Sequence, residues 1–282
     1  MRDIRPSWPI LNRRSPLFSG LKFAMLGRGA RTVTGFDSSP FNNNGTLTNM
    51  DPATDWVWDA TLGRWGVDYD GTDYIALSSA QLYAVPAGGL SFTIAFWFKA
   101  IAAEPDYYSA AIAFGGTDDL MIYPNENIPA LGYKGVRIFW RDCTFNIIKE
   151  NVAPRSATTW YHLCFVNVSG SQKLYIDGVV IASNTISTSS GGPFNSLRLG
   201  GWADGSQPYV GSLADPCIWS RALAPGEIAA LADRSNVMLD CGGIPLIRPF
   251  VNKTYFWSGS VPGATPWLYA HRRNSRVIGV FA

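Results

Sequence analysis

The sequence is poor in charged side chains and has none of the long apolar runs that mark a membrane protein. Asp, Glu, Lys and Arg make up 16% of its 282 residues, compared with about a quarter in an average domain. No run approaches the roughly 18 apolar residues that a membrane helix needs. The N-terminal stretch contains charges and prolines but not the continuous apolar region of a signal peptide. We therefore expect no membrane partner and no secretion signal.

Cysteine is also scarce, and its spacing excludes the common metal and redox motifs. No two cysteines form a C-x-x-C pair, and the four are Cys143, Cys164, Cys217 and Cys241. Reduced, buried thiols and synthesis in a reducing cytoplasm fit this spacing best, although a single disulfide stays open. The net charge of +2 argues neither for nor against a nucleic-acid partner, and the only basic clusters lie near the two ends, where solubilising the termini is the simpler interpretation. We expect no nucleic-acid partner.

The sequence is rich in short strand-like segments that are separated by turn residues. Hydrophobic residues make up 47% of the chain, which also contains 28 glycines and 18 prolines. Such segments, with almost no helical periodicity, are typical of an all-β sandwich of the jelly-roll type. The predicted strands are Trp65–Tyr69, Tyr74–Leu77, Ser91–Lys99, Ser109–Phe114, Asp119–Tyr123, Gly135–Trp140, Phe145–Lys149, Trp160–Val168, Gln172–Ile176, Val179–Ser183, Ser196–Leu199 and Leu213–Ser220.

One hairpin and one helix can be predicted from particular residues. In the stretch LYIDGVVIAS, Asp177 and Gly178 stand between alternating apolar residues, which predicts a two-residue turn because both tolerate positive φ. We therefore interpret Asp177 as a turn residue and not as a catalytic one. In ALAPGEIAALADRSN, Pro225 fits the first turn of a helix, and Glu227 favours the positive end of the helix dipole. This segment predicts one short packed helix.

No group of residues predicts catalysis. Glycosidases need two carboxyl groups that flank the scissile bond, and the best candidate pair is Asp118 and Asp119. Neighbouring strand residues point to opposite faces, so this pair converges poorly. His162 lies in an apolar strand with Cys164, and an apolar strand interior does not activate a thiol. We expect the chain not to be an enzyme.

Five segments, in this order, resemble the laminin-G-like, concanavalin A-like jelly roll. The resemblance covers roughly residues 35–233. Its five segments read FTIAFWFKA, WYHLCFV, LYIDG, LRLGG and GSLADPCIWSRALAPGEIAAL. The earlier runs NRRSPLFSGLKFAMLGRGA, GFDSSPFNNNGTLTNM and WDATLGRWGVDYDGTDYIAL are similar to a subgroup that is common in bacteriophage and environmental viral sequences. The chain departs from this subgroup at residues 22–29 and at Tyr74.

The resemblance implies a domain organisation. We expect a two-sheet antiparallel jelly-roll sandwich over residues 35–235, with one short helix. An N-terminal arm over residues 1–34 and a C-terminal arm over residues 236–282 would extend from it, because the strand pattern degrades there into proline-rich, aromatic segments.

The resemblance also implies one structural calcium ion between an early loop and the final strand. Calcium prefers six to eight hard oxygen ligands. The loop FDSSPFNNNG offers Asp37, Asn42 and Asn44, and Asp215 stands at the position of a late aspartate. Ordinary turn formation explains the same loop residues, so both readings stay open. A second, weaker candidate is the loop DGTDY, residues 70–74.

Exposed aromatic residues on loops are the candidates for ligand recognition, because sugar rings stack on their faces. The loop GGWADGSQPY supplies a polar and aromatic group, which is Trp202, Asp204, Gln207 and Tyr209. A second such group is Trp140, Arg141 and Asp142. The alternative is that Trp202 and Tyr209 only cover the edge of the sandwich, since most of the 11 tryptophans must be core residues.

Taken together, the sequence and the resemblance favour a non-catalytic structural or adhesion protein of a phage virion. It would be a capsid decoration, a fibre base or a tail-associated component, made in the host cytoplasm. Its arms would contact other virion proteins or copies of itself, because an apolar arm invites a partner. One alternative is a carbohydrate-binding module that recognises a host surface glycan. The other is a glycan hydrolase or lyase with an unrecognised acid pair.

Overall fold

The computed structural model describes the chain in segments. These are residues 10–11, 13–27, 31–78, 80–83, 85, 91–100, 109–116, 120–128, 133–140, 146–149, 158–185, 194–202, 206–233 and 239–240. The chain divides into the units Met1–Gly243 and Ile244–Ala282, and the second unit lies outside the described residues. None of the described helices is long and apolar enough to cross a membrane.

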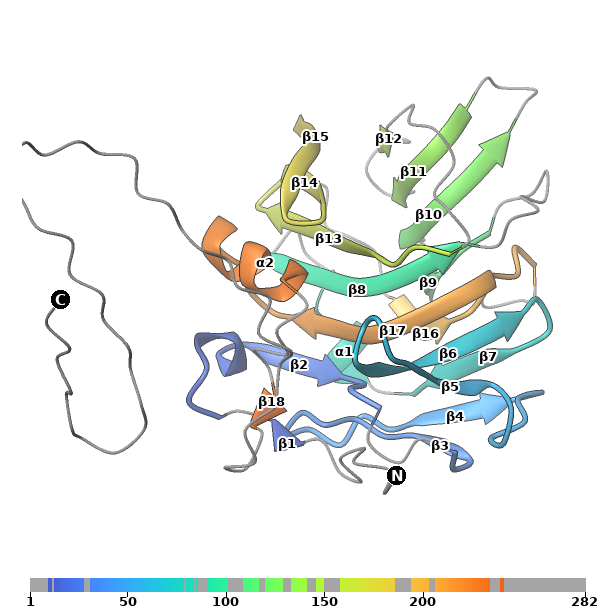
Figure 1. Cartoon of the computed structure of the whole chain (residues 1–282). Coiled ribbons are helices and arrows are strands. Elements are labelled where there is room, and N and C mark those ends of the chain that lie inside the picture. The colour runs from blue at the N-terminus through green and yellow to red at the C-terminus, as the bar shows by residue number, and fades with distance from the viewer. Residues whose placement is uncertain are drawn as a thin grey trace, which may run out of the picture. The chain divides into compact units, whose positions relative to one another are not determined.

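Two antiparallel sheets form the sandwich (Figure 1). Sheet I has the spatial order β15 (Val179–Thr185), β14 (Ser171–Ile176), β13 (Tyr161–Val168), β8 (Phe92–Ala100), β17 (Val210–Trp219), β6 (Arg64–Asp70) and β5 (Trp56–Asp59). Sheet II has the order β12 (Asn146–Lys149), β11 (Tyr133–Trp140), β10 (Leu120–Ile128), β9 (Ile112–Gly116), β16 (Phe194–Leu199), β7 (Tyr74–Leu77), β4 (Gly45–Thr48) and β3 (Thr34–Gly35). The predicted all-β, concanavalin A-like sandwich is therefore confirmed.

The main core lies between the inner faces of the two sheets. Alternate residues of β8 and β13 contribute Phe96, Phe98 and Phe165, while β9 and β10 contribute Phe114 and Ile122, and all five are fully buried. In β8 the outward residues Ala95 and Trp97 are buried as well, because two smaller apolar clusters cover the outside of sheet I. This double burial explains why the strand reads FTIAFWF without alternation.

The strand and helix predictions are confirmed within the described residues. Each of the twelve predicted segments overlaps an observed strand, and the predicted helix is α2 (Pro225–Ala232). Asp177 and Gly178 have φ values of 49° and 81°, as the predicted turn requires. The Asp177 carboxylate also accepts a 2.7 Å hydrogen bond from the backbone N–H of His162, so it ties the turn to the neighbouring strand.

The segment before β3, which we predicted as part of an N-terminal arm, belongs to the sandwich. A 3₁₀ turn, η1 (Pro16–Phe18), leads into β2 (Leu21–Ala24). Strand β2 pairs with the second half of β17, whereas β6 pairs with the first half. A bulge at Asp215 and Pro216 separates the two halves. Figure 1 shows β2 running beside the end of β17.

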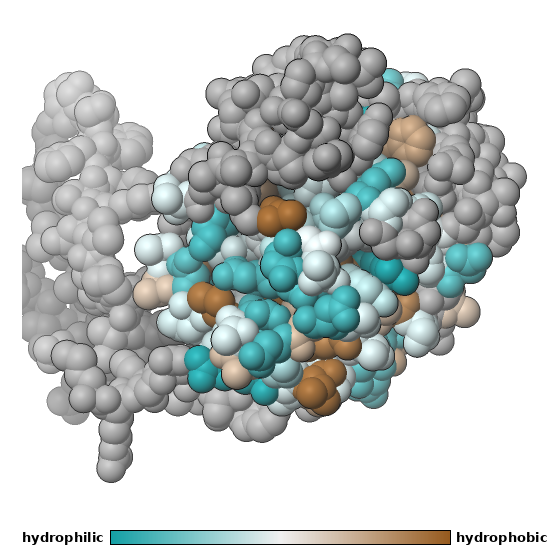
Figure 2. Space-filling view, turned by 90° about the vertical axis from the view of Figure 1, so that its right-hand side faces the viewer, coloured by the Kyte–Doolittle hydropathy of each residue, from teal (hydrophilic) through white to brown (hydrophobic). Residues whose placement is uncertain are grey.

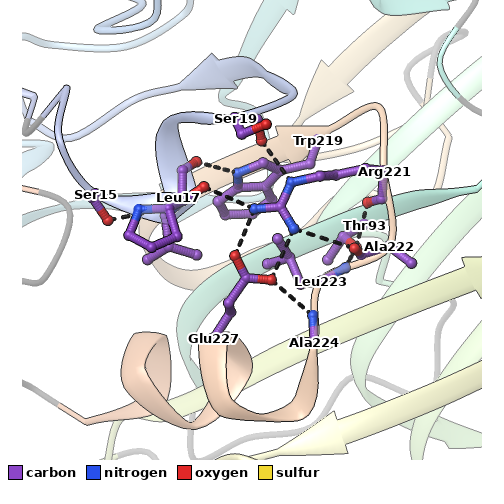
Figure 3. Close-up of polar contacts among 11 residues, drawn as sticks. Ser15, Leu17, Ser19, Thr93, Trp219, Arg221, Ala222, Leu223, Ala224 and Glu227 are labelled. Atoms are coloured by element: carbon purple, nitrogen blue, oxygen red, sulfur yellow. Dashed lines mark hydrogen bonds and ion pairs between the residues drawn. The ribbon is translucent and has the colours of Figure 1, made fainter.

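Arg221 holds this N-terminal segment against the end of sheet I (Figure 3). Its guanidinium donates hydrogen bonds to the carbonyl oxygens of Pro16 (3.0 Å) and Ser19 (2.7 Å). The same group forms a bidentate ion pair with the Glu227 carboxylate, at 2.6 and 2.8 Å. The Arg221 hydrogen bonds are the main reason why the pKa of Glu227 lies below its ordinary value. A boundary at residue 34 therefore does not separate an arm from the domain.

The other helix and strands that the structure describes are short. One turn of helix, α1 (Ala80–Tyr83), follows β7. Strand β18 (Leu239–Asp240) pairs with β1 (Ile10–Leu11) in a separate two-stranded sheet. The rest of the predicted C-terminal arm, residues 241–282, lies outside the described residues.

We predict that Phe23→Ala lowers the free energy of unfolding by about 3–5 kcal/mol, because it removes a fully buried ring from the main core. Urea unfolding measures this value. The matched control is Lys22→Ala, at the neighbouring, half-buried position of β2, for which we expect a loss below about 1 kcal/mol. Equal, small losses for both variants would show that β2 is a loose arm.

Candidate functional site

The loop between β16 and β17, residues 200–209, folds back onto sheet II; we call it the Trp202 loop. Its residues 203–205 lie outside the described part of the chain. Gly200 has a φ of 98°, and a Cβ there would overlap the ring of Tyr69, so only glycine fits. The Gly200 N–H donates to the Ala111 carbonyl (2.9 Å), and the Gln207 carbonyl accepts from the Ala110 N–H (3.2 Å). Both ends of the loop are thus fixed to the segment that leads into β9.

Trp202 lies half-buried on the outer face of sheet II. Its indole packs against a buried cluster of Ala110, Ala113, Met121 and Tyr123, against which Phe139 also packs. The strand residues among them, Ala113, Met121 and Tyr123, alternate with residues of the main core, so they face away from the other sheet. Trp202 therefore keeps part of its ring accessible on a firm apolar support.

Polar groups surround this support. The Gln207 side-chain carbonyl accepts a 2.6 Å hydrogen bond from the Tyr123 hydroxyl. The guanidinium of Arg137 lies 4.3 Å from the centroid of the Tyr123 ring. The guanidinium of Arg198, on β16 two strands from β10, lies 4.0 Å from the Tyr74 ring centroid. It donates a 3.2 Å hydrogen bond to the Trp202 carbonyl. The site combines aromatic faces, an amide and arginines.

The structure corrects the predicted role of Tyr209. We predicted this residue as a ligand contact, but its side chain is only 1% exposed and belongs to the main core. Its ring packs edge-on against Tyr69 with a centroid separation of 5.9 Å, and burial raises the pKa of its hydroxyl. Tyr209 anchors the Trp202 loop from below. Asp204, the fourth predicted contact, lies outside the described residues.

The second predicted ligand-binding group was Trp140, Arg141 and Asp142. Trp140, the one described residue of this group, does not lie on the surface. Trp140 is 1% exposed and packs against Phe92 in the main core. Its predicted companions Arg141 and Asp142 lie outside the described residues.

Of the four predicted calcium ligands, the three early ones share one loop, in which Asp37 serves as a hydrogen-bond acceptor. The Asp37 carboxylate accepts from the backbone N–H groups of Ala24, Ser39 and Asn43, at 2.8–3.0 Å. The Asn44 side-chain carbonyl accepts from the Asp37 N–H (2.9 Å). Asn42 is an exposed turn residue with a φ of 53°.

Asp215, the fourth predicted ligand, forms a buried ion pair instead. Its carboxylate lies 2.7 Å from the Arg64 guanidinium, and the two side chains are 13% and 7% exposed. Burial raises the pKa of Asp215, while the Arg64 cation acts in the opposite direction. Because Asp37 and Asp215 both satisfy protein donors, this residue set does not fit a calcium ion. No group of three or more His, Cys, Asp or Glu side chains that could hold a metal occurs among the described residues.

The weaker candidate loop, residues 70–74, forms the turn between β6 and β7. Asp70 accepts hydrogen bonds from the Thr72 N–H and hydroxyl. Burial, and to a smaller extent the neighbouring Asp70 and Asp55, raises the pKa of Asp73 to about 6. Hydrogen bonds from Thr72 lower the pKa of Asp70, so the pKa values of the two aspartates of the turn are shifted in opposite directions.

The residues considered for catalysis do not form a reactive pair where the structure describes them. Burial, and secondarily the Arg64 cation, lowers the pKa of His162 to about 3, and the His162 ring packs edge-on against Trp97. Burial also raises the pKa of the Cys164 thiol. Both are interior residues of sheet I. Asp118 and Asp119 lie outside the described residues.

The chain belongs to the laminin G family Laminin_G_3, described as the concanavalin A-like lectin/glucanases superfamily, whose model matches residues 69–229. Pentraxin-4 from Homo sapiens is 32% identical over 84 residues, which are 26% of this chain, and the match spans only 18% of Pentraxin-4.

Solved structures with the same architecture include binding domains and a larger enzyme. Domain 4 of AbnA, a GH43 extracellular arabinanase from Geobacillus stearothermophilus solved with arabinotriose, superposes with a TM-score of 0.58 at 17% identity, over 75% of this chain and 98% of that domain. The binding domain of botulinum neurotoxin DC, solved with rat synaptotagmin II, gives 0.55 at 12% identity, over 76% and 51%. Trypanosoma rangeli sialidase gives 0.56 at 14% identity, over 79% and 34%. At these identities the likeness establishes the fold.

We predict that Arg64→Met lowers the free energy of unfolding by about 3–5 kcal/mol, because it leaves the Asp215 carboxylate buried without its cation. The control is Lys99→Met, which removes a more exposed cation 3.7 Å from Asp59 and is expected to cost below about 1 kcal/mol. Urea unfolding of both variants measures the difference. If Arg64→Met cost no more than the control, the buried pair would have no structural role.

Proposed function

We propose that the chain is a non-catalytic adhesion domain that binds carbohydrate on the outer face of sheet II. The observation that carries the proposal is the half-buried indole of Trp202, which the Trp202 loop holds on an apolar support beside Gln207 and Arg198. A sugar presents an apolar ring face and a rim of hydroxyls. An aromatic face with a few fixed polar groups is the complementary surface.

The support beneath Trp202 favours binding because it is already in place. Ala113 and Met121 are almost fully buried, and the backbone hydrogen bonds of the loop hold its ends. A ligand therefore need not order the loop ends before it stacks on the ring, and the entropic cost of binding is smaller. On the side of the molecule shown in Figure 2, coloured apolar residues lie among hydrophilic ones.

Three of the described carboxylates, Asp37, Asp59 and Asp215, support a role without bond cleavage because protein donors engage each of them. Asp37 and Asp215 satisfy protein donors. Burial opposes ionisation of Asp59, but hydrogen bonds from Thr61, Trp160 and Leu62 together lower its pKa to about 2. A glycosidase needs one carboxyl group that is free to donate a proton and another that is free to act on the sugar. The placements of Asp37, Asp215 and Asp59 favour binding over hydrolysis.

The similar structures support a binding role in general terms. One is a domain of an arabinanase that was solved with arabinotriose, and another is the binding domain of a neurotoxin that was solved with synaptotagmin II. Carbohydrate is the ligand class that the chemistry of Trp202, Gln207 and Arg198 favours for this chain.

We predict that Trp202→Ala weakens polysaccharide binding by at least about tenfold, which corresponds to about 1.4 kcal/mol, because the stacking face is lost. Calorimetry with arabinan, dextran, polygalacturonate and hyaluronan measures the affinity. The matched control is Trp58→Ala, which removes a half-buried tryptophan of β5 in the other sheet and should leave binding unchanged. Unchanged binding by Trp202→Ala would refute the site, and release of reducing ends would refute the non-catalytic role.

The setting that we propose for this domain is a phage virion, in agreement with the phage-like N-terminal motifs. The described N-terminal segment is bound within its own sandwich. We therefore propose that the C-terminal region makes the contact with other virion proteins or with a second copy of the chain. Residues 244–282 are the best candidate, because their sequence is rich in apolar and aromatic residues that invite a partner.

We predict that removal of residues 244–282 abolishes assembly and leaves polysaccharide affinity within about twofold of the full chain. Sedimentation and incorporation into particles measure assembly, and calorimetry measures affinity. Assembly by the shortened chain would refute the virion contact that we assign to this unit, and the adhesion role would stand.

A further inference from the structure

Arg198 differs from Arg64 and Arg221, each of which has a carboxylate partner. Arg64 pairs with Asp215, and Arg221 pairs with Glu227. Arg198 lies on β16, half-buried in the outer face of sheet II. Its contacts are the Tyr74 ring and the Trp202 carbonyl, and among the described residues it has no carboxylate partner.

A half-buried guanidinium without a counter-anion is incompletely compensated. Arginine carries five N–H donors in a planar fork, and one hydrogen bond to the Trp202 carbonyl at 3.2 Å occupies part of that fork. The Tyr74 ring compensates some of the lost hydration through its π face. The remaining donors suit a planar anionic group, which arginine binds with two parallel hydrogen bonds.

The position of Arg198 relative to Trp202 makes this anion part of the ligand. The hydrogen bond joins Arg198 to the backbone of the residue whose indole forms the stacking face. The neighbouring strand β4 pairs Thr46 with Ala76 and Thr48 with Tyr74, and this pairing places two threonines on the same face of the sheet. The face therefore offers a cation and hydroxyl groups next to an aromatic ring.

Arg198 packs on Tyr74, and the described carboxylates closest to Tyr74 in the sequence are Asp70 and Asp73, in the turn that precedes it. Asp70 accepts from the N–H and hydroxyl of Thr72, and Asp73 accepts from the Asp70 N–H. Both are engaged within that turn and neither is paired with Arg198. Among the described residues, neither of these two carboxylates therefore neutralises Arg198.

We infer that the ligand of this site is an acidic saccharide, whose ring stacks on Trp202 while its carboxylate or sulfate pairs with Arg198. This inference rests on the proposed carbohydrate-binding function. Carboxylate and sulfate share the chemistry that Arg198 recognises, and the binding experiment distinguishes between them.

The experiment compares matched acidic and neutral polymers by calorimetry with the full chain. The probes are polygalacturonate and its carboxyl-reduced form, and dextran sulfate and dextran. We expect at least about tenfold tighter binding to the acidic member of one pair, and the preferred pair identifies the anion. In Arg198→Met this preference should fall to within about twofold, while weak binding to the neutral polymer persists.

Two control variants separate recognition from general charge. Arg13→Met removes the same charge from an exposed position and should keep the preference. Arg198→Lys keeps the charge but lacks the planar fork, and should retain only part of the preference. Arg198→Met could also destabilise the fold, which a lower thermal unfolding midpoint would reveal. In that case the acidic preference of Arg198→Lys tests the role of Arg198, since lysine preserves the cation beside Tyr74.

The outcomes that overturn the inference differ from those that overturn the proposed function. Equal binding of acidic and neutral polymers, lost in Trp202→Ala, would refute the acidic ligand and leave carbohydrate binding in place. A preference that survives in Arg198→Met, or that falls equally in Arg13→Met, would also refute the role of Arg198. Absence of binding to every polymer, together with no effect of Trp202→Ala, would refute the proposed function itself.

Discussion

The close packing of Gly200 on Tyr69 is the contact on which the candidate site depends. A side chain at position 200 would overlap the tyrosine ring, and Tyr69 in turn packs against Tyr209 at the other end of the Trp202 loop. Two buried aromatic rings therefore lie under the two ends of one loop. Because the rings belong to the main core, the loop is positioned by the folding of the sandwich, and Trp202 is presented on sheet II without a ligand.

The scarcity of charge in the sequence becomes understandable from the placement of the charged groups. Asp37 accepts backbone hydrogen bonds from two segments, Asp215 neutralises Arg64 at the β17 bulge, and Glu227 neutralises Arg221 beside η1. The Asp215–Arg64 pair joins strands that are distant in the sequence. Glu227 pairs with the guanidinium of Arg221, which itself binds the distant carbonyl groups of Pro16 and Ser19. A strand arrangement that removed one partner of a buried ion pair would leave an uncompensated charge, which is costly in free energy. These pairs therefore favour the observed arrangement of the strands. Arg198, which lies at the candidate site, has no such acidic partner among the described residues.

Much of the sandwich could be predicted from the sequence, because period-two alternation and the Asp177-Gly178 turn are local signals. Strand β2 was missed because Pro16, Gly20 and Gly27 interrupt the pattern around it, and its partner β17 is about 200 residues away. Tyr209 was misassigned because burial on the inner side of a sheet cannot be distinguished from exposure on a loop when the neighbouring residues are polar. Asp37 looked like a metal ligand because carboxylate and amide oxygens bind cations and N–H donors equally well.

Of the candidate site, the sequence predicted Trp202 and Gln207 but neither Arg198 nor Phe139. These two come from separate strands, and only the order of strands in sheet II brings them to the same face as the Trp202 loop. A crystal structure with an acidic oligosaccharide, taken from the polymer that binds most tightly, tests the central claim most directly. The account predicts an intact sugar ring stacked on Trp202 with its anionic group at Arg198. A ligand bound elsewhere, or cleaved between two carboxyl groups, would contradict it.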